Sequence, residues 1–365
     1  MKIDLIDLKQ RFAEEKTEIL ACLEDVLDRG SLVLTEEVSD FEKSICDFTN
    51  SKFCLGLNSG TDALMMSLWS NGIGKGDEVI TSNISFIASV GAIAHVGAIP
   101  ILVDVRNDLN IDPEKIESKI TNKTKAIMPV HWTGRICEMD KIKDLANKYN
   151  LIIIEDAAQA IGSFYKGTHA GSFGSISAYS AHPLKNLNAI GDAGYVTTND
   201  EQLYDKIKLY RNHGLESRDN VAIFGVNSRL DSLNAKILSF RLTKLKSVIA
   251  KRQHNVSLYR KNILTDKVQI PEEHKFLKNS YVMFICICEN RDKLKLYLDE
   301  KGIQSLIYYN TPLHLHKASK SLGYKYGDFP ISENLCSKVL AFPHHQYLKE
   351  YEIEYICEHI NKFYS

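Results

Sequence analysis

The sequence has no excess of charge of either sign. Its 365 residues carry 45 basic and 46 acidic side chains, giving a formal net charge of -1, and the isoelectric point lies near 6.9. A chain without a basic field has no long-range attraction for nucleic acid or for an anionic membrane surface. Neither class of partner is therefore expected.

Long hydrophobic runs are also missing. No apolar stretch approaches the roughly 20 residues that a membrane span needs. The N-terminus, MKIDLIDLKQRFAEEKTEIL, becomes charged too early for a secretory signal. With 44% hydrophobic and 25% charged residues, the composition is that of an ordinary globular chain. We predict a cytoplasmic protein.

Closely spaced cysteines are rare. Of the eight cysteines, only Cys286 and Cys288 are near neighbours, and their spacing in YVMFICICEN puts both on one face of a predicted strand. No second pair supplies further ligands, so we interpret the cysteines as reduced packing residues and expect neither a metal site nor a disulfide.

A dinucleotide-binding turn is absent as well. The glycine-rich stretch NGIGKGDE (71–78) follows a helical pattern and precedes a strand. A G-x-G-x-x-G turn of a nicotinamide enzyme would follow the strand and open the helix. The reversed order argues against a nicotinamide-dependent oxidoreductase.

What the sequence does contain is an α/β pattern between about residues 50 and 200. Apolar runs alternate with helical stretches, and the run LIIIED is apolar at consecutive positions, as in a central strand covered on both faces. The pattern predicts a sheet of about seven strands at 52–58, 77–83, 99–105, 124–132, 151–156, 175–180 and 194–199.

The pattern of apolar and charged residues changes near residue 240. A long charged helical stretch, FRLTKLKSVIAKRQHNVSLYRKNI, is followed by the strand-like SYVMFICIC and the helical RDKLKLYLDEKGI. We predict a large domain over residues 1–240, including an N-terminal helical segment, and a smaller α+β domain over residues 241–365. Because no low-complexity linker separates them, the two are expected to pack tightly.

Polar groups follow several of the predicted strands, at the edge where open α/β sheets bind ligands. Asp156 ends the most apolar strand, and Gly60 and Thr61 open a helix in NSGTDAL. Each signal is weak alone, because a carboxylate at a strand end is more often a helix cap and a Gly-Thr helix start also serves ordinary turns.

Lys185, in YSAHPLKNLNAIGDAGYVTTND, favours a functional role for these residues. Pyridoxal phosphate (PLP) needs a lysine for its Schiff base, an acid opposite its ring nitrogen and an anion site for its phosphate. Lys185 and Asp156 would supply the first two. Gly60, Thr61 and Ser180 would bind the phosphate, and Phe86 would stack on the ring. An isolated lysine in such a loop would otherwise be read as a surface residue.

The order of motifs resembles the DegT/DnrJ/EryC1/StrS family of sugar aminotransferases. The motifs are NSGTDAL, SFIAS, EDAAQAIGSFYKGTHAGSFGSISAYSAHPLKNLNAIGDAGYVTTND, RNHG and NSRLD, spread over residues 50 to 232. The resemblance implies a fold-type-I PLP enzyme: an α/β large domain with a mixed, mostly parallel seven-stranded sheet flanked by helices, plus a smaller α+β domain. It also implies a homodimer with active sites shared between subunits.

The resemblance also assigns further residues. Gln159 matches the residue near the cofactor's ring hydroxyl, and Asn227 matches the asparagine that reaches the phosphate from the neighbouring subunit. His314, in PLHLH, is a candidate on the substrate side. His182 would act either as a general acid–base group or as an orienting hydrogen-bond partner.

Two other interpretations have weaker support in the sequence. Arg229 and Asp231 are expected to pair with each other and hold their loop. Tyr308, Tyr309 and Arg211 are candidates for contact with a nucleotide or diphosphate, although most tyrosines and arginines of a chain serve the surface or the core.

The resemblance implies transfer of an amino group from L-glutamate to a nucleotide-linked keto-sugar, in amino-sugar biosynthesis for a surface polysaccharide or similar. The segment KNLNAIGDAG favours a 3-keto-6-deoxyhexose, although Asn188 departs from the glycine usual in that branch. Alternatives are a 4-keto-sugar or other small keto acceptor, sugar dehydration, for which some relatives carry histidine in place of Lys185, and a non-catalytic regulatory role.

Overall fold

The seven predicted strands form one sheet. The computed structural model describes residues 1–273 and 275–365, and within them the strands lie in the order β1-β9-β8-β5-β4-β2-β3. Their bounds are β1 Phe53–Leu57, β2 Glu78–Ser82, β3 Ile99–Val103, β4 Thr124–Met128, β5 Ile152–Asp156, β8 Ile176–Ser180 and β9 Gly194–Thr198. The predicted fold class is therefore confirmed.

The sheet is mixed but mostly parallel. Strands β3, β2, β4, β5 and β8 run parallel to one another, and β9 is antiparallel to both β8 and β1. The carboxyl ends of the parallel strands therefore meet at one edge, where Asp156 ends β5 and Ser180 ends β8.

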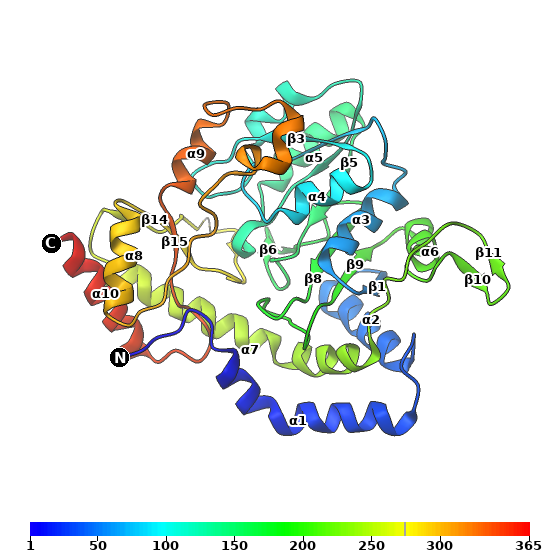
Figure 1. Ribbon diagram of the computed structural model, residues 1–365, viewed down its shortest axis with the longest axis horizontal. Coiled ribbons are helices and arrows are strands. Elements are labelled where there is room, and N and C mark those ends of the chain that lie inside the picture. The colour runs from blue at the N-terminus through cyan, green and yellow to red at the C-terminus, as the bar shows by residue number, and fades with distance from the viewer. Residues whose placement is uncertain (274) are drawn as a thin grey trace.

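Helices cover both faces of the sheet (Figure 1). One face packs on α2 (Glu36–Thr49), α5 (Met139–Tyr149) and α7 (Ser232–Asn262), and the other packs on α3 (Gly60–Ser70), α4 (Ala88–His95) and α6 (Glu201–Tyr210). Successive side chains of a strand point to opposite faces. Accordingly Ile153 belongs to the first core and Ile154 to the second, as the consecutive apolar residues of this strand predict.

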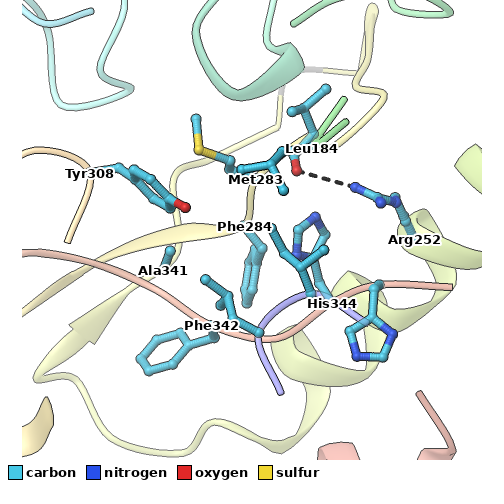
Figure 2. Close-up of a pocket in the computed structure, with 12 residues that line it drawn as sticks. Leu184, Arg252, Met283, Phe284, Tyr308, Ala341, Phe342 and His344 are labelled. Atoms are coloured by element: carbon cyan, nitrogen blue, oxygen red, sulfur yellow. Dashed lines mark hydrogen bonds between the residues drawn. The ribbon is translucent and has the colours of Figure 1, made fainter. Parts of the chain in front are cut away.

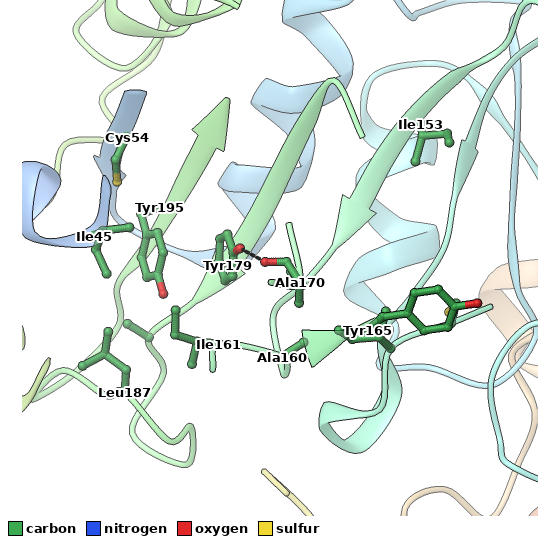
Figure 3. Close-up of a cluster of buried hydrophobic side chains, with 14 of the residues drawn as sticks. Ile45, Cys54, Ile153, Ala160, Ile161, Tyr165, Ala170, Tyr179, Leu187 and Tyr195 are labelled. Carbon is green, nitrogen blue, oxygen red and sulfur yellow. Dashed lines mark hydrogen bonds between the residues drawn. The ribbon is translucent and has the colours of Figure 1, made fainter. Parts of the chain in front are cut away.

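Two stacked tyrosines fill part of the first core. Tyr179 of β8 pairs with Tyr195 of β9, and their ring centroids are 4.8 Å apart. The Tyr179 hydroxyl donates to Ala170 O at 2.6 Å, as Figure 3 shows. The hydroxyl of a buried tyrosine usually finds such a partner.

The C-terminal part builds a second, smaller core. A three-stranded sheet of β12 (Val268–Gln269), β14 (Ile285–Cys288) and β15 (Val339–Ala341) packs with α8 (Arg291–Glu300) and α10 (Glu350–Tyr364). Cys286 and Cys288 are both buried in this core, which confirms that they share a face.

Two features connect this part to the rest. Helix α7 runs across the predicted boundary at residue 240 and packs on α1 (Leu8–Arg29), α2 and α10. Near the N-terminus, Ile3 pairs with Ile303 and lies in the smaller core. The division at residue 240 stays a prediction, and the N-terminal residues lie against the C-terminal part (Figure 1).

The remaining elements connect these layers. Short strands are β6 (Phe164–Tyr165), β7 (Thr168–His169) and β13 (Leu277–Lys278) in one sheet, and β10 (Leu215–Ser217) and β11 (Asn220–Val221) in a hairpin. Helix α9 spans Pro330–Cys336, and 3-10 turns lie at Pro113–Lys115, Glu117–Lys119, Trp132–Gly134, Leu313–Leu315 and Lys317–Leu322. No helix in the described ranges is long and apolar enough to cross a membrane.

A buried carboxylate fixes the tip of the central strand. Glu155 accepts hydrogen bonds from His131 Nε2 at 2.8 Å and from the backbone N–H groups of Gly171, Phe173 and Gly174 at 2.7 Å each. Burial acts to raise the pKa of Glu155, but the hydrogen bond from His131 and the backbone donors outweigh it and lower that pKa. The loop over residues 171–174 is thereby tied to the strand that presents Asp156.

We predict that Glu155→Gln destabilises the apoprotein by about 2–4 kcal/mol at neutral pH, because an amide cannot accept from all of these donors. A lowered folded-state pKa means that the stabilisation is full above the unfolded pKa of about 4.3 and is lost as pH falls further. The difference between variant and wild type in urea unfolding should therefore shrink below about pH 4. Glu24→Gln, at an exposed position, is the control; a pH-independent difference would contradict the account.

Candidate active site

Lys185 lies in the loop that follows β8. Its backbone N–H donates to His182 O at 2.8 Å, and its side chain is half-buried. Burial lowers the pKa of Lys185 to about 8, and the Asp156 carboxylate acts in the opposite direction. Within the described part of the chain, Nζ forms no hydrogen bond or ion pair. The structure thus provides a desolvated amine of the kind that carbonyl chemistry requires.

Asp156 lies buried at the end of β5, on the neighbouring strand. Its Oδ2 accepts from Ser89 Oγ at 2.7 Å and its Oδ1 accepts from Ala158 N at 3.2 Å. Burial raises the pKa of Asp156, while these two donors and the charge of Lys185 oppose the rise. Because β5 and β8 are neighbouring parallel strands, Asp156 and the loop that carries Lys185 lie at the same edge of the sheet.

The first turn of α3 forms the predicted anion cradle. The N–H groups of Gly60 and Thr61 begin the helix and have no acceptor within it. A Cβ atom on Gly60 would lie 2.7 Å from Ser180 Cβ, and one on Gly194 would lie 2.3 Å from the carbonyl of Ser59. The glycines therefore let the helix N-terminus sit directly against Ser180, where a phosphate could be bound by backbone N–H groups and a hydroxyl.

The two predicted contacts of the cofactor ring, Phe86 and Gln159, follow β2 and β5. Phe86 is 54% exposed, and its ring centroid is 6.3 Å from that of Tyr309, which in turn is 5.6 Å from Trp132. Gln159 is buried, and its Oε1 accepts from Thr133 N at 2.8 Å. Its Nε2 is the remaining donor. Phe86 thus offers a ring face, and Gln159 offers an amide N–H.

His182 is exposed at the turn before Lys185. Its Nδ1 accepts from Leu184 N at 3.2 Å, and its backbone N–H donates to Ser180 Oγ at 3.3 Å. One ring nitrogen therefore stabilises the turn that carries Lys185, which favours the orienting role over the acid–base role.

Asn227 follows the β10–β11 hairpin. Its side chain is exposed, and its backbone pairs with Asn212. The predicted pairing of Arg229 with Asp231 is wrong: among the described residues no such ion pair forms, and Arg229 Nη1 donates to Asn212 Oδ1 at 3.2 Å. Arg229 still holds the loop, through an amide rather than a carboxylate.

The structure corrects the interpretation of His314. The side chain is buried; its Nδ1 accepts from Asn83 Nδ2 at 2.9 Å, and its Nε2 donates to Glu333 Oε1 at 3.0 Å. Burial lowers the pKa of His314, although Glu333 acts to raise it. With both ring nitrogens bonded, His314 braces the segment after β2 and does not face a substrate.

Tyr308 and Arg211, two of the candidates for contact with a nucleotide, can also be located in the structure. Tyr308 lines a cavity of about 20 Å³ beside Leu184 and Phe284 (Figure 2), which is room for a water molecule rather than a sugar. Arg211 is buried and donates to Glu42 Oε1 at 2.5 Å and to Gly56 O at 2.9 Å. The cavity beside Tyr308 is therefore too small for a nucleotide, and Arg211 is engaged in contacts within the chain.

The residues present therefore fit PLP. The cradle that a Cβ atom on Gly60 would fill suits a phosphate, and the buried Asp156 carboxylate needs a cationic neighbour such as a protonated ring nitrogen. Lys185 and Asp156 stand at the ends of adjacent strands. The sequence analysis did not identify Ser89, which donates to Asp156. The available signal was its place at the end of the SFIAS motif.

The comparisons with known proteins point to the same cofactor chemistry. The family model of the DegT/DnrJ/EryC1/StrS aminotransferase family matches residues 13–361. The chain is 38% identical over 362 residues to dTDP-3-amino-3,6-dideoxy-alpha-D-galactopyranose transaminase of Aneurinibacillus thermoaerophilus, covering 99% of each chain. It is 36% identical over 368 residues to the "Pleiotropic regulatory protein" of Geobacillus stearothermophilus, covering 100% of this chain and 99% of the relative.

A solved structure extends the likeness to three dimensions. The crystal structure of S. venezuelae DesV, in complex with a ketimine intermediate, superimposes with a TM-score of 0.97 at 33% identity, covering 99% of this chain and 98% of that one. The sheet and both parts of the fold are thus shared with this structure.

We predict that Gly60→Ala weakens PLP binding at least about tenfold, because the new methyl group must displace Ser180 and the helix N-terminus. The matched control is Gly91→Ala, whose Cβ would meet nothing within 4 Å. Fluorescence titration of both apoproteins with PLP measures the effect. Equal affinity in the two variants would show that the phosphate binds elsewhere.

Proposed function

The chain belongs to the DegT/DnrJ/EryC1/StrS family of PLP-dependent sugar aminotransferases, and from this premise we propose that it transfers the amino group of L-glutamate to C3 of a nucleotide-linked 3-keto-6-deoxyhexose. The proposal is carried by one observation: the desolvated Lys185, in the loop after β8, and the buried Asp156, at the end of the adjacent strand β5, lie at the sheet edge that also presents the Gly60–Ser180 cradle. The Aneurinibacillus relative, named for a 3-amino-3,6-dideoxy sugar, supports the choice of acceptor.

When bound, PLP supplies an electron sink for negative charge on the reacting carbon. Lys185 Nζ would tether the cofactor and, once the amino donor has taken its place, accept the proton from the donor's α-carbon. Its pKa near 8 leaves a substantial fraction of the free amine neutral near physiological pH, as a general base requires. Nζ would then pass this proton to the C4′ carbon of the cofactor. In the second half-reaction it would take a proton from C4′ and deliver it to the sugar carbon that receives the nitrogen.

Other residues hold the cofactor in place. Asp156 would keep the proton on the ring nitrogen, and Gln159 Nε2 would donate to the ring hydroxyl. Gly60, Thr61 and Ser180 would bind the phosphate, and Phe86 would stack on one ring face. These groups come from α3, the segment before α4, β5 and β8, so that the sheet edge fixes their relative positions.

The proposed homodimer has support in the exposed apolar surface. The segment that follows the β10–β11 hairpin carries the fully exposed Phe224, and α1 carries the exposed Leu20 and Leu27. The hairpin projects from the body of the molecule (Figure 1). Exposed apolar groups of this extent favour burial against a partner, and a second copy would bring Asn227 to the neighbouring phosphate cradle.

A regulatory role is the second candidate, because one full-length relative carries a regulatory name. The arrangement of Lys185, Asp156 and the cradle argues against loss of catalysis in this chain. Lys185 likewise argues against dehydration, since dehydrating relatives carry histidine at that position. The predictions of a cytoplasmic location and a surface-polysaccharide product rest on the sequence alone.

The acceptor is tested by product analysis. The holoenzyme is incubated with L-glutamate that carries an isotope label on its amino nitrogen and either a 3-keto or a 4-keto nucleotide-linked 6-deoxyhexose, and the sugar carbon that bears the labelled nitrogen is located by NMR. We predict label at C3 and turnover of the 3-keto sugar at least about tenfold faster. Preferred labelling at C4 would reverse the choice of acceptor, and no labelled sugar with either would favour a different acceptor class or the regulatory role.

The shared site is tested by subunit complementation. Lys185→Ala should lack amino transfer but keep its fold, and Asn227→Ala should retain PLP poorly. In a mixed dimer one site combines the intact Lys185 of one subunit with the intact Asn227 of the other. We therefore expect co-expressed variants to exceed the mean activity of the two parents. Activity no higher than that mean would place Asn227 in the site of its own chain.

A further inference from the structure

Two buried serines lead from the segment after β2 to the Asp156 carboxylate. Ser85 Oγ lies 2.8 Å from Ser89 Oγ, and Ser89 Oγ lies 2.7 Å from Asp156 Oδ2. Both serines are buried. A serine inside a helix can donate to the carbonyl four residues earlier, as Ser67 does to Ala63 O at 2.6 Å in α3, whereas Ser89 lies in the first turn of α4. Ser89 donates across to β5 instead, which points to a role outside its own helix.

The direction of donation follows from the chemistry of the groups. An ionised carboxylate only accepts, so the single proton of Ser89 goes to Asp156 Oδ2. The Ser85 hydroxyl must then donate to Ser89 Oγ. Because Ala158 N donates to the other oxygen at 3.2 Å, both carboxylate oxygens are held and the side chain has one orientation.

On the basis of the proposed PLP site, we propose that Ser89, supported by Ser85, is a positioning residue that orients the Asp156 carboxylate toward the cofactor's ring nitrogen and keeps it ionised. A hydrogen bond to the charged form of an acid favours that form. An ionised Asp156 in turn keeps the ring nitrogen protonated, which the electron sink requires.

The position of the serines adds a second effect. Ser85 and Ser89 flank Phe86, the proposed stacking ring, so the same hydrogen bonds tie the segment that carries Phe86 to the tip of β5. Asn83 holds the other end of this segment, where its Oδ1 accepts from His314 N at 3.1 Å. One segment therefore positions both a ring face and the acid for the ring nitrogen.

The charged and titratable groups that face Asp156 are Lys185 from the loop after β8 and His131 from the segment after β4. Lys185 is consumed in the Schiff base when PLP is bound. His131 donates to Glu155, as described above. Ser89 is thus the side chain that donates directly to Asp156 in the described structure, and its removal leaves Oδ2 without that donor.

The experiment compares Ser89→Ala, Ser89→Thr and the control Ser67→Ala in the full-length protein. We expect Ser89→Ala to raise the dissociation constant of PLP about tenfold or more, the size typical of a hydrogen bond to a charged group. A more basic Asp156 draws the proton from the ring nitrogen, and loss of that positive charge makes the Schiff-base nitrogen more basic. The visible band of the lysine-bound cofactor should therefore titrate at a higher pH in Ser89→Ala.

The other variants separate positioning from folding. Ser89→Thr keeps the hydroxyl and should restore the PLP affinity and the band titration to near the wild-type values. Ser67→Ala loses a buried hydroxyl without contact to Asp156 and should change neither. If Ser89→Ala does not fold, Ser85→Ala should shift both quantities in the same direction by a smaller amount.

Two results would overturn the inference: an unchanged band titration and PLP affinity in Ser89→Ala, or a loss that threonine does not rescue. Wild-type protein decides the proposed function separately. If wild type binds no PLP, or its bound PLP does not react with L-glutamate, the proposed function fails irrespective of Ser89.

Discussion

The buried carboxylate of Asp156 is the charge on which the site depends. An ionised group away from water is costly unless hydrogen bonds and an opposite charge compensate it. Ser89 and Ala158 supply the hydrogen bonds, and Lys185 supplies a positive charge nearby. The neighbouring Glu155, on the opposite face of the same strand, holds the loop over residues 171–174 and thus fixes the strand end from the other side.

The loop that carries Lys185 is held between the two parts of the fold. Asn186 Nδ2 donates to Ser280 O at 2.8 Å, and Arg241 of α7 donates to Asn188 O at 2.7 Å. Asn188 also donates to Pro183 O at 2.6 Å. The asparagine that departs from the usual glycine therefore has a structural role: it closes the turn around Lys185. These hydrogen bonds fix the loop at several points, as the proposed double role of Lys185 as tether and base requires.

Much of the fold could be predicted because its signals are local. The strands are short apolar runs whose successive residues, such as Ile153 and Ile154, face opposite cores. Asp156 ends one of these strands, and Lys185 lies in the loop after another. The partners of polar side chains were not predictable, because they come from distant segments: Ser89 reaches Asp156 across 67 positions and His314 reaches Asn83 across 231. The same reason explains the wrong pairing of Arg229 and the misplaced role of His314.

The central claim is that Lys185 is the residue that binds PLP covalently. The direct measurement is to add PLP to the wild-type protein, reduce the complex with borohydride, digest it and locate the pyridoxyl group by mass spectrometry. The account predicts one modified peptide, which contains Lys185. Modification of a different lysine, or none under conditions in which PLP is bound, would contradict it.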